Sequence, residues 1–183
     1  MKTYIALLRG INVSGQKMIK MQALLEMFNT LPVKHAKTYI QSGNVVFQYK
    51  GSDLDGLQKK IEKKIKDTFG FEVPVILVAA DSIEGVLKNN PFIKKKDCDV
   101  EKLYFIFFTG TIDKAGLDKI SQGSYGTDEF SIKGNVIYLH LPNNYGNTKL
   151  NNNFFESKLK IVASARNLKT MNALKAMAEG IED

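Results

Sequence analysis

The sequence has a single cysteine, Cys98, among its 183 residues. One thiol cannot form an internal disulfide, and this is typical of proteins from a reducing compartment. No apolar run approaches the roughly 20 residues that a membrane helix needs. Met1 to Thr3 lead directly into a strand-like segment, so we expect no secretory signal. These absences predict a cytoplasmic protein without membrane contact.

Residues of the common catalytic sites are also scarce. The two histidines, His35 and His140, lie in unrelated segments without metal-ligand spacing, and we expect each to be a partly buried, hydrogen-bonded strand residue. Asp97 and Asp99 flank Cys98 and oppose formation of a thiolate, which argues against a nucleophile. No Gly-x-Ser-x-Gly elbow occurs. The sequence therefore indicates no metal and no cofactor, and it leaves open whether the protein is an enzyme.

What the sequence does contain is a repeated pattern. Residues 39–47 (YIQSGNVVF) and 130–138 (FSIKGNVIY) both place Gly-Asn-Val between apolar, β-prone runs. A similarity at such a long period indicates an internal duplication. The two copies differ nearby, since the first has Arg9 and Asn12 where the second has Thr109 and Ile112.

Apolar periodicity predicts the same order of elements in both halves. The first half has expected strands at 3–10, 35–41, 44–49 and 73–78, and helices at 18–31 and 53–69. The second has expected strands at 102–109, 128–133, 135–141 and 161–165, and helices at 113–121 and 151–160. A short helix is also expected from Asp81 to Lys88, and a last one near 170–181.

The order β-α-β-β-α-β is ferredoxin-like. We therefore predict an α+β fold with two ferredoxin-like units, antiparallel sheets and a C-terminal helix. The polar run 94–99 is the expected linker, which gives domains at 1–92 and 100–183.

The loop at residues 9–17 resembles a phosphate loop but does not match its pattern. Lys17 comes one residue late, and Met18 replaces the hydroxyl that would bind magnesium, so a nucleoside-triphosphatase is excluded. Glycines beside Arg9 and Lys17, ahead of a helix N-terminus, still fit an anion site. The same glycines could serve only to form a tight turn.

The segment 141–160 is dense in hydrogen-bonding side chains. Asparagine suits turns and helix caps, and this is the simpler interpretation of the segment. Lys149 and Glu156 nevertheless stand among many further polar groups. Beyond them, Arg166 precedes the last helix, for which Asn167 or Thr170 is the expected cap.

The formal charge of +7 raises the question of nucleic-acid binding. Much of this charge lies on the helix 53–69, opposite its apolar stripe, where lysines are more often a solvated face. The hairpins also lack the aromatic residues on which RNA-recognition domains stack bases. Four other residues occupy the corresponding places: Asn44, Val46, Asn135 and Ile137.

Five separated motifs together resemble a bacterial family known as domain of unknown function 1697. They are ALLRGINV at 6–13, YIQSGNV at 39–45, NPF at 90–92, LP at 141–142 with TKL at 148–150, and RN at 166–167 with Thr170. The family usually has Gly-Gly at Ser14-Gly15, tryptophan at Leu168 and threonine at Ala165. The resemblance implies an α+β cytoplasmic protein and establishes no biochemical activity.

The first functional hypothesis is a binding protein for an anionic small molecule, such as a nucleotide or phosphorylated metabolite, in a cleft between the two units. Its expected ligand residues are Arg9, Asn12, Lys17, Gln41, Ser42, Asn44, Lys149, Arg166 and Asn167. One alternative is an enzyme that uses the same cluster, with Lys149 or Glu156 as acid or base. The other is non-sequence-specific nucleic-acid binding through the lysine-rich helix. The oligomeric state is left open.

Overall fold

The structure is a computed structural model that describes residues 1–96 and 98–181. The chain divides into two compact units. One comprises Met1–Gly85 together with Asn172–Asp183, and the other comprises Val86–Met171. Whether the chain also folds as the domains 1–92 and 100–183 stays a prediction.

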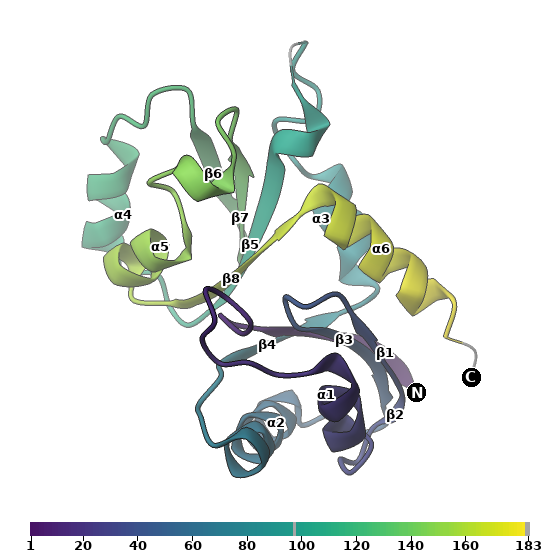
Figure 1. Cartoon of the computed structure of the whole chain (residues 1–183). Coiled ribbons are helices and arrows are strands. Elements are labelled where there is room, and N and C mark those ends of the chain that lie inside the picture. The colour runs from purple at the N-terminus through teal and green to yellow at the C-terminus, as the bar shows by residue number, and fades with distance from the viewer. Residues whose placement is uncertain (97, 182–183) are drawn as a thin grey trace. The chain divides into compact units, whose positions relative to one another are not determined.

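The first unit is a four-stranded antiparallel sheet with two helices on one face (Figure 1). The strand order is β2-β3-β1-β4, as the ferredoxin-like prediction requires. Its elements are β1 (Lys2–Leu8), α1 (Met21–Phe28), β2 (Lys34–Tyr39), β3 (Asn44–Tyr49), α2 (Leu54–Phe69) and β4 (Val75–Ala79), followed by α3 (Ser82–Lys88).

The second unit repeats the arrangement with the order β6-β7-β5-β8 (Figure 1). Its elements are a 3-10 turn at Val100–Lys102, β5 (Leu103–Thr109), α4 (Lys114–Ser121), β6 (Glu129–Lys133), β7 (Val136–His140), a 3-10 turn at Tyr145–Asn147, α5 (Asn152–Leu159) and β8 (Val162–Asn167). The C-terminal helix α6 spans Leu168–Glu179. The predicted α+β fold with two ferredoxin-like units and a C-terminal helix is confirmed.

Local signals explain where the longest helix begins and ends. Asp53 caps α2, since its Oδ1 accepts a hydrogen bond from Gly56 N at 2.8 Å. Gly70 ends the helix with φ 83°, a left-handed conformation that glycine adopts without strain. The apolar stripe between them buries Leu57, Ile61 and Ile65 against the sheet.

The repeated Gly-Asn-Val triplets occupy the same hairpin in each unit but are one residue out of register. Leu7 pairs with Asn44 in the first sheet, whereas Phe107 pairs with Val136 in the second. Asn44 therefore corresponds to Val136 and not to Asn135. The reason is hairpin length, since residues 40–43 connect β2 to β3 but only residues 134–135 connect β6 to β7. The expectation from the repeat, that Gly43–Val45 and Gly134–Val136 superpose, was wrong, although the duplicated architecture holds.

This register shift also changes the comparison with RNA-recognition sheets. The helix-free face of the second sheet does carry aromatic side chains on its two central strands: Phe105, Phe107 and Tyr138. Each is no more than 2% exposed. The prediction that aromatic residues are missing was wrong for this unit, and the expectation that no bases stack there stays a prediction.

No helix in the described ranges 1–96 and 98–181 is both long and apolar enough to span a membrane.

Candidate functional site

Six of the nine expected ligand residues lie in one part of the first unit, which we call the β1–α1 corner: residues 9–20 and 40–44. Because β1 runs antiparallel to both neighbours, its end meets the beginnings of β3 and β4. Leu8 N donates to Gly43 O, and Arg9 N donates to Pro74 O, both at 2.9 Å. The fold thus brings the loop after β1 against the β2–β3 hairpin.

Asn12 fastens this loop to the hairpin. Its Nδ2 donates to the carbonyl oxygens of Ile19 at 3.0 Å and Gln41 at 2.8 Å, and its Oδ1 accepts from Ile19 N at 2.8 Å. Its φ is 55°, in the left-handed region that asparagine tolerates better than most residues. Asn12 is therefore a positioning residue of the corner, and Gln41 takes part through its backbone carbonyl.

Asn44 braces the hairpin from inside. It is fully buried, and its Nδ2 donates to Tyr39 O at 2.9 Å and to Ser42 Oγ at 3.1 Å. Buried amides are costly unless they are hydrogen-bonded, so these contacts account for the residue's presence. That Ser42 and Asn44 also contact a ligand stays a prediction.

Lys17 of the corner bonds to a neutral group. Its Nζ donates to the carbonyl oxygen of Glu72 at 2.7 Å. The Glu72 carboxylate itself pairs with Lys66 at 2.8 Å, and this hydrogen bond lowers the pKa of Glu72. The charge of Lys17 makes a smaller contribution to this lowered pKa, but among the described residues no carboxylate is within ion-pair distance of Lys17. Arg9 is half-buried at the end of β1.

Helix α1 begins in this corner without the usual cap. Its N-cap residue, Lys20, makes no side-chain capping bond, and the first turn holds no acidic residue. By contrast, carboxylate or amide oxygens cap α2, α4 and α5, from Asp53, Asp113 and Asn151. A helix N-terminus carries partial positive charge, so this one presents donors and positive potential. Lys20 was not among the expected ligand residues, although it lies directly before the expected apolar stripe.

The backbone of the corner is held in unusual conformations. Ile40 has φ 47°, an outlier for a β-branched residue. Left-handed backbone costs roughly 1–2 kcal/mol for residues other than glycine, and such strain clusters at functional sites. Positive φ values occur at seven residues of the corner: Gly10, Asn12, Ser14, Gly15, Lys17, Ile40 and Gly43.

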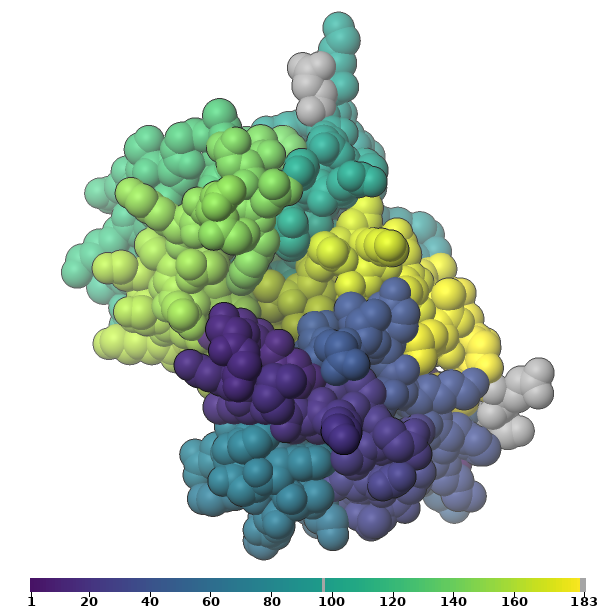
Figure 2. Space-filling view, viewed as in Figure 1, coloured from purple at the N-terminus to yellow at the C-terminus, as the bar shows by residue number. Residues whose placement is uncertain are grey.

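The corner also presents apolar side chains to solvent. Val13 is 58% exposed, Met18 63% and Ile40 46%. Figure 2 shows this part of the chain, in purple, at the surface of the first unit. The corner therefore combines positive charge with an apolar surface.

The three remaining candidates belong to the second unit, in separate places. Lys149 is exposed in the β7–α5 connection. Arg166 lies within β8, not after the last strand as expected, and is 7% exposed. Its Nη1 donates to Ser164 Oγ at 2.8 Å and to Ala165 O at 2.7 Å.

Asn167 caps α6, since its Oδ1 accepts from Thr170 N at 2.8 Å. That Arg9 and Arg166 serve one cleft stays a prediction.

Glu156, the other candidate acid or base, has a structural role. Its Oε1 accepts from Ala163 N at 3.0 Å, which ties α5 to the edge strand β8. Glu62 of α2 makes the same bond to Val75 N of β4 at 2.9 Å. The two amides are equivalent, because Val75 pairs with Leu8 and Ala163 pairs with Phe108. We call these two contacts the glutamate braces.

The histidines and the cysteine form no catalytic group. His140 is buried, with Nδ1 3.4 Å from Glu129 Oε1, as expected, but His35 is exposed at a register shift of β2. Burial, and to a lesser degree Asp99, raises the pKa of the Cys98 thiol, which disfavours a thiolate; Asp97 lies outside the described residues. Within the described ranges, no three His, Cys, Asp or Glu side chains come together as a metal site.

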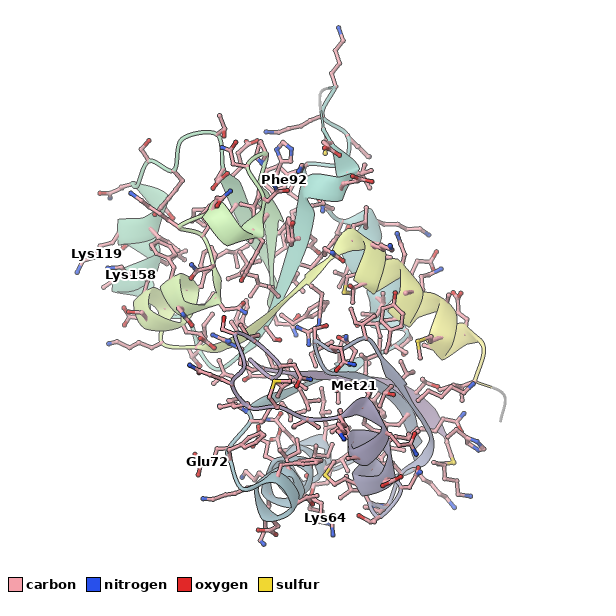
Figure 3. All side chains as sticks on the ribbon, viewed as in Figure 1. Met21, Lys64, Glu72, Phe92, Lys119 and Lys158 are labelled. Atoms are coloured by element: carbon pink, nitrogen blue, oxygen red, sulfur yellow. The ribbon has the colours of Figure 1, made fainter. Side chains whose placement is uncertain are left out.

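The lysines of α2 lie away from its apolar stripe, as predicted: Lys59, Lys60, Lys63 and Lys66 are exposed and Lys64 is half-buried. Lys64 points away from the sheet (Figure 3). Some of this charge is paired locally, with Lys63 and Asp67 2.7 Å apart. Exposed pairs of this kind contribute little to stability and are screened by salt.

Comparison with known proteins identifies the family. The profile described as protein of unknown function, DUF1697, matches residues 1–138. The chain belongs to the DUF1697 family. The match covers both hairpins and the β1–α1 corner, and it ends before Lys149, Arg166 and Asn167. No curated protein matches the sequence.

The chain is also similar to a solved structure, the conserved bacterial protein SP0830 from Streptococcus pneumoniae. The sequence identity is 22%, the TM-score is 0.75, and the alignment covers 97% of this chain and 98% of SP0830. At this identity the similarity supports the fold and does not extend to function.

Proposed function

We propose that this DUF1697 protein binds an anionic small molecule, a nucleotide or phosphorylated metabolite, at the β1–α1 corner. The observation that carries the proposal is the N-terminus of α1, which has no side-chain cap and no acidic first turn and which comes after a loop containing Arg9, Lys17 and Lys20. Helix N-termini with free amides favour anions, and basic side chains strengthen such sites.

The exposed apolar side chains favour a ligand that is more than phosphate. Val13, Met18 and Ile40 offer a surface on which the base or another apolar part of a nucleotide could pack. The strained backbone of the corner fits this function, because strain persists where the surrounding structure enforces it. Asn12 enforces it through its three hydrogen bonds.

Thermal stability in the presence of defined anions tests the proposal. AMP and inorganic phosphate should raise the melting temperature at constant ionic strength, AMP more than phosphate. The double substitution of Lys17 and Lys20 by alanine should remove most of this shift. Lys59→Ala, which removes an equally exposed lysine from α2, should leave the shift unchanged. No shift with AMP, phosphate or a panel of nucleotides and sugar phosphates would contradict the proposal.

A second double substitution, on α2, distinguishes the nucleic-acid alternative. Binding through α2 should be lost in Lys59→Glu with Lys63→Glu, and its affinity for duplex DNA should fall steeply with salt. Binding at the corner should survive this double substitution. A DNA affinity that depends on Lys59 and Lys63, without any response to AMP, would replace the anion proposal by the alternative.

A further inference from the structure

The second unit contains a polar pocket that the function proposed above does not use. It has a volume of about 290 Å³ and is formed by residues 124–128, before β6, and residues 143–149, after β7. Besides Tyr125, whose hydroxyl donates to Ile120 O, and Gly126, its lining has two aliphatic hydroxyls, two amides, a carboxylate and an ammonium group: Ser124, Thr127, Asn143, Asn147, Asp128 and Lys149. The pocket lies wholly within the second unit and shares no residue with the β1–α1 corner.

Asp128 is the unusual group in this pocket. Thr148 Oγ1 donates to its Oδ2 at 2.5 Å, and Leu150 N in turn donates to Thr148 Oγ1 at 2.9 Å. Oδ1 is buried, and within the described residues it has no hydrogen-bond partner. A buried polar atom without a partner costs free energy, so a donor that reaches the Asp128 carboxylate would be favoured.

The walls of the pocket are held by one bond between the two connections and by one within the second connection. Asn143 Nδ2 donates to Thr127 Oγ1 at 3.3 Å, and Asn147 Nδ2 donates to Asn143 O at 3.1 Å. Lys149 is exposed, and in the described part of the chain it has no carboxylate within ion-pair distance. The pocket therefore offers a fixed acceptor and an unmatched positive charge in one cavity.

We propose that this pocket binds a polyhydroxylated small molecule that carries an anionic group, with the chemistry of a pentose phosphate. A ligand hydroxyl would donate to the carboxylate of Asp128, which lines the pocket, and the anionic group would pair with Lys149. Hydroxyl and amide groups both donate and accept, so they suit the ring hydroxyls of a sugar. A simple anion fits less well because Asp128 repels it, and a simple amine fits less well because Lys149 repels it.

The proposal goes beyond the function assigned to the corner, and the two can fail separately. Isotope-labelled full-length protein should be titrated with D-ribose 5-phosphate, D-ribose, inorganic phosphate and L-serine. The affinity is measured from the amide shifts in proton–nitrogen correlation spectra. Ribose 5-phosphate should shift the amides of 124–128 and 143–149 and bind at least tenfold more tightly than either ribose or phosphate.

Variants assign the two contacts. Lys149→Ala and Asp128→Asn should each weaken ribose 5-phosphate binding at least tenfold, and Lys149→Ala should leave the weaker binding of ribose unchanged. Lys119→Ala is the matched control, because Lys119 is also exposed and points outward from α4 (Figure 3). If Asp128→Asn does not fold, as judged by circular dichroism, Asn147→Ala at the exposed rim replaces it, with the same expected loss.

Several outcomes would overturn the proposal. Equal affinity for inorganic phosphate and ribose 5-phosphate would reduce the site to an anion contact at Lys149. Binding of L-serine without binding of ribose 5-phosphate would show a zwitterion site instead. No shift of these amides with any probe would reject the pocket as a binding site. Shifts confined to the amides of residues 9–20 would support the corner and reject the pocket.

Discussion

The two units have the same architecture but differ in the connection between their first strand and their first helix. In both, a helix glutamate braces the amide of the edge strand, at Glu62 with Val75 and at Glu156 with Ala163. The connection from β1 to α1 occupies residues 9–20, whereas that from β5 to α4 occupies only residues 110–113. The fold therefore does not require the longer loop, and function is better sought where the units differ than where they agree.

The hairpins of the two units differ in the same way. The longer β2–β3 connection turns Asn44 into the first, buried residue of a strand, while Asn135 stays in an exposed two-residue turn. A shift of one residue moves a side chain to the other face of a sheet, so identical triplets have different roles. In the first unit the hairpin supports the β1–α1 corner through Asn12 and Gln41.

The largest difference between the units is expected at their hairpin glycines. A Cβ at Gly43 would lie 2.6 Å from Ile11 Cδ1 and 2.9 Å from Leu8 Cβ, with φ 79°. At Gly134 it would meet nothing within 4 Å, at φ 58°. Gly43→Ala should therefore lower the free energy of unfolding by about 3 kcal/mol, from backbone strain and overpacking, and Gly134→Ala by about 1 kcal/mol, from strain alone.

Urea unfolding followed by circular dichroism measures both changes. Equal effects of the two substitutions would mean that Ile11 moves aside without cost, and that the corner is less rigid than its contacts suggest. The two hairpins would then not differ in how much free energy of unfolding an added methyl group costs.

The next difference concerns the two asparagines. Asn44→Ala removes the bonds to Tyr39 O and Ser42 Oγ in a fully buried place and should cost about 2 kcal/mol. Asn135→Ala, in an exposed turn, should stay within about 0.5 kcal/mol. Equilibrium unfolding again provides the measurement. A larger loss at Asn135 than at Asn44 would show that the triplets are equivalent after all.

The two asparagines also show how far the sequence could predict the structure. Periodicity was sufficient for the α-helices and strands but not for the two 3-10 turns, because most of the longer elements have an apolar side facing a core. The register of the hairpins was not predictable, since it depends on where the turn ends and not on which residues it contains. The sequence predicted that the expected ligand residues of the corner lie in loops at strand ends. It did not predict the hydrogen bonds of Asn12 and Asn44, because their acceptors include backbone carbonyls of other segments. The sequence did not single out Asp128, because the burial of its Oδ1 without a hydrogen-bond partner depends on tertiary packing.

The glutamate braces provide a test of what the units share. Glu62→Ala and Glu156→Ala should each cost about 1–2 kcal/mol, because each removes a charged acceptor from a strand amide. Glu62→Gln and Glu156→Gln keep an acceptor and should cost less than half of this. Chemical denaturation of the four variants checks the equivalence. A loss at Glu62 without one at Glu156 would break the structural equivalence and reopen a catalytic role for Glu156.

The smallest expected difference depends on pH. Glu129 pairs with His140 across the second sheet at the position where the first sheet pairs Lys34 with Gln48. Lys95, 2.5 Å from Glu129 Oε2, lowers the pKa of Glu129 through a hydrogen bond, and His140 contributes further. A carboxyl whose pKa is lower in the folded state adds stability above its unfolded pKa, and this stability is lost as the pH falls through the folded pKa.

Glu129→Gln should therefore destabilise the protein at pH 7 and have little effect near pH 3. The side chain of Glu129 is 41% exposed, so solvent screening limits the effect at pH 7 to about 0.5 kcal/mol. Glu101→Gln, an exposed substitution just before β5, is the control and should show no pH-dependent difference. Urea unfolding of wild type and both variants at the two pH values measures the effect. A Glu129→Gln penalty that persists unchanged at pH 3 would mean that packing, not the charge of this pair, distinguishes the second sheet from the first.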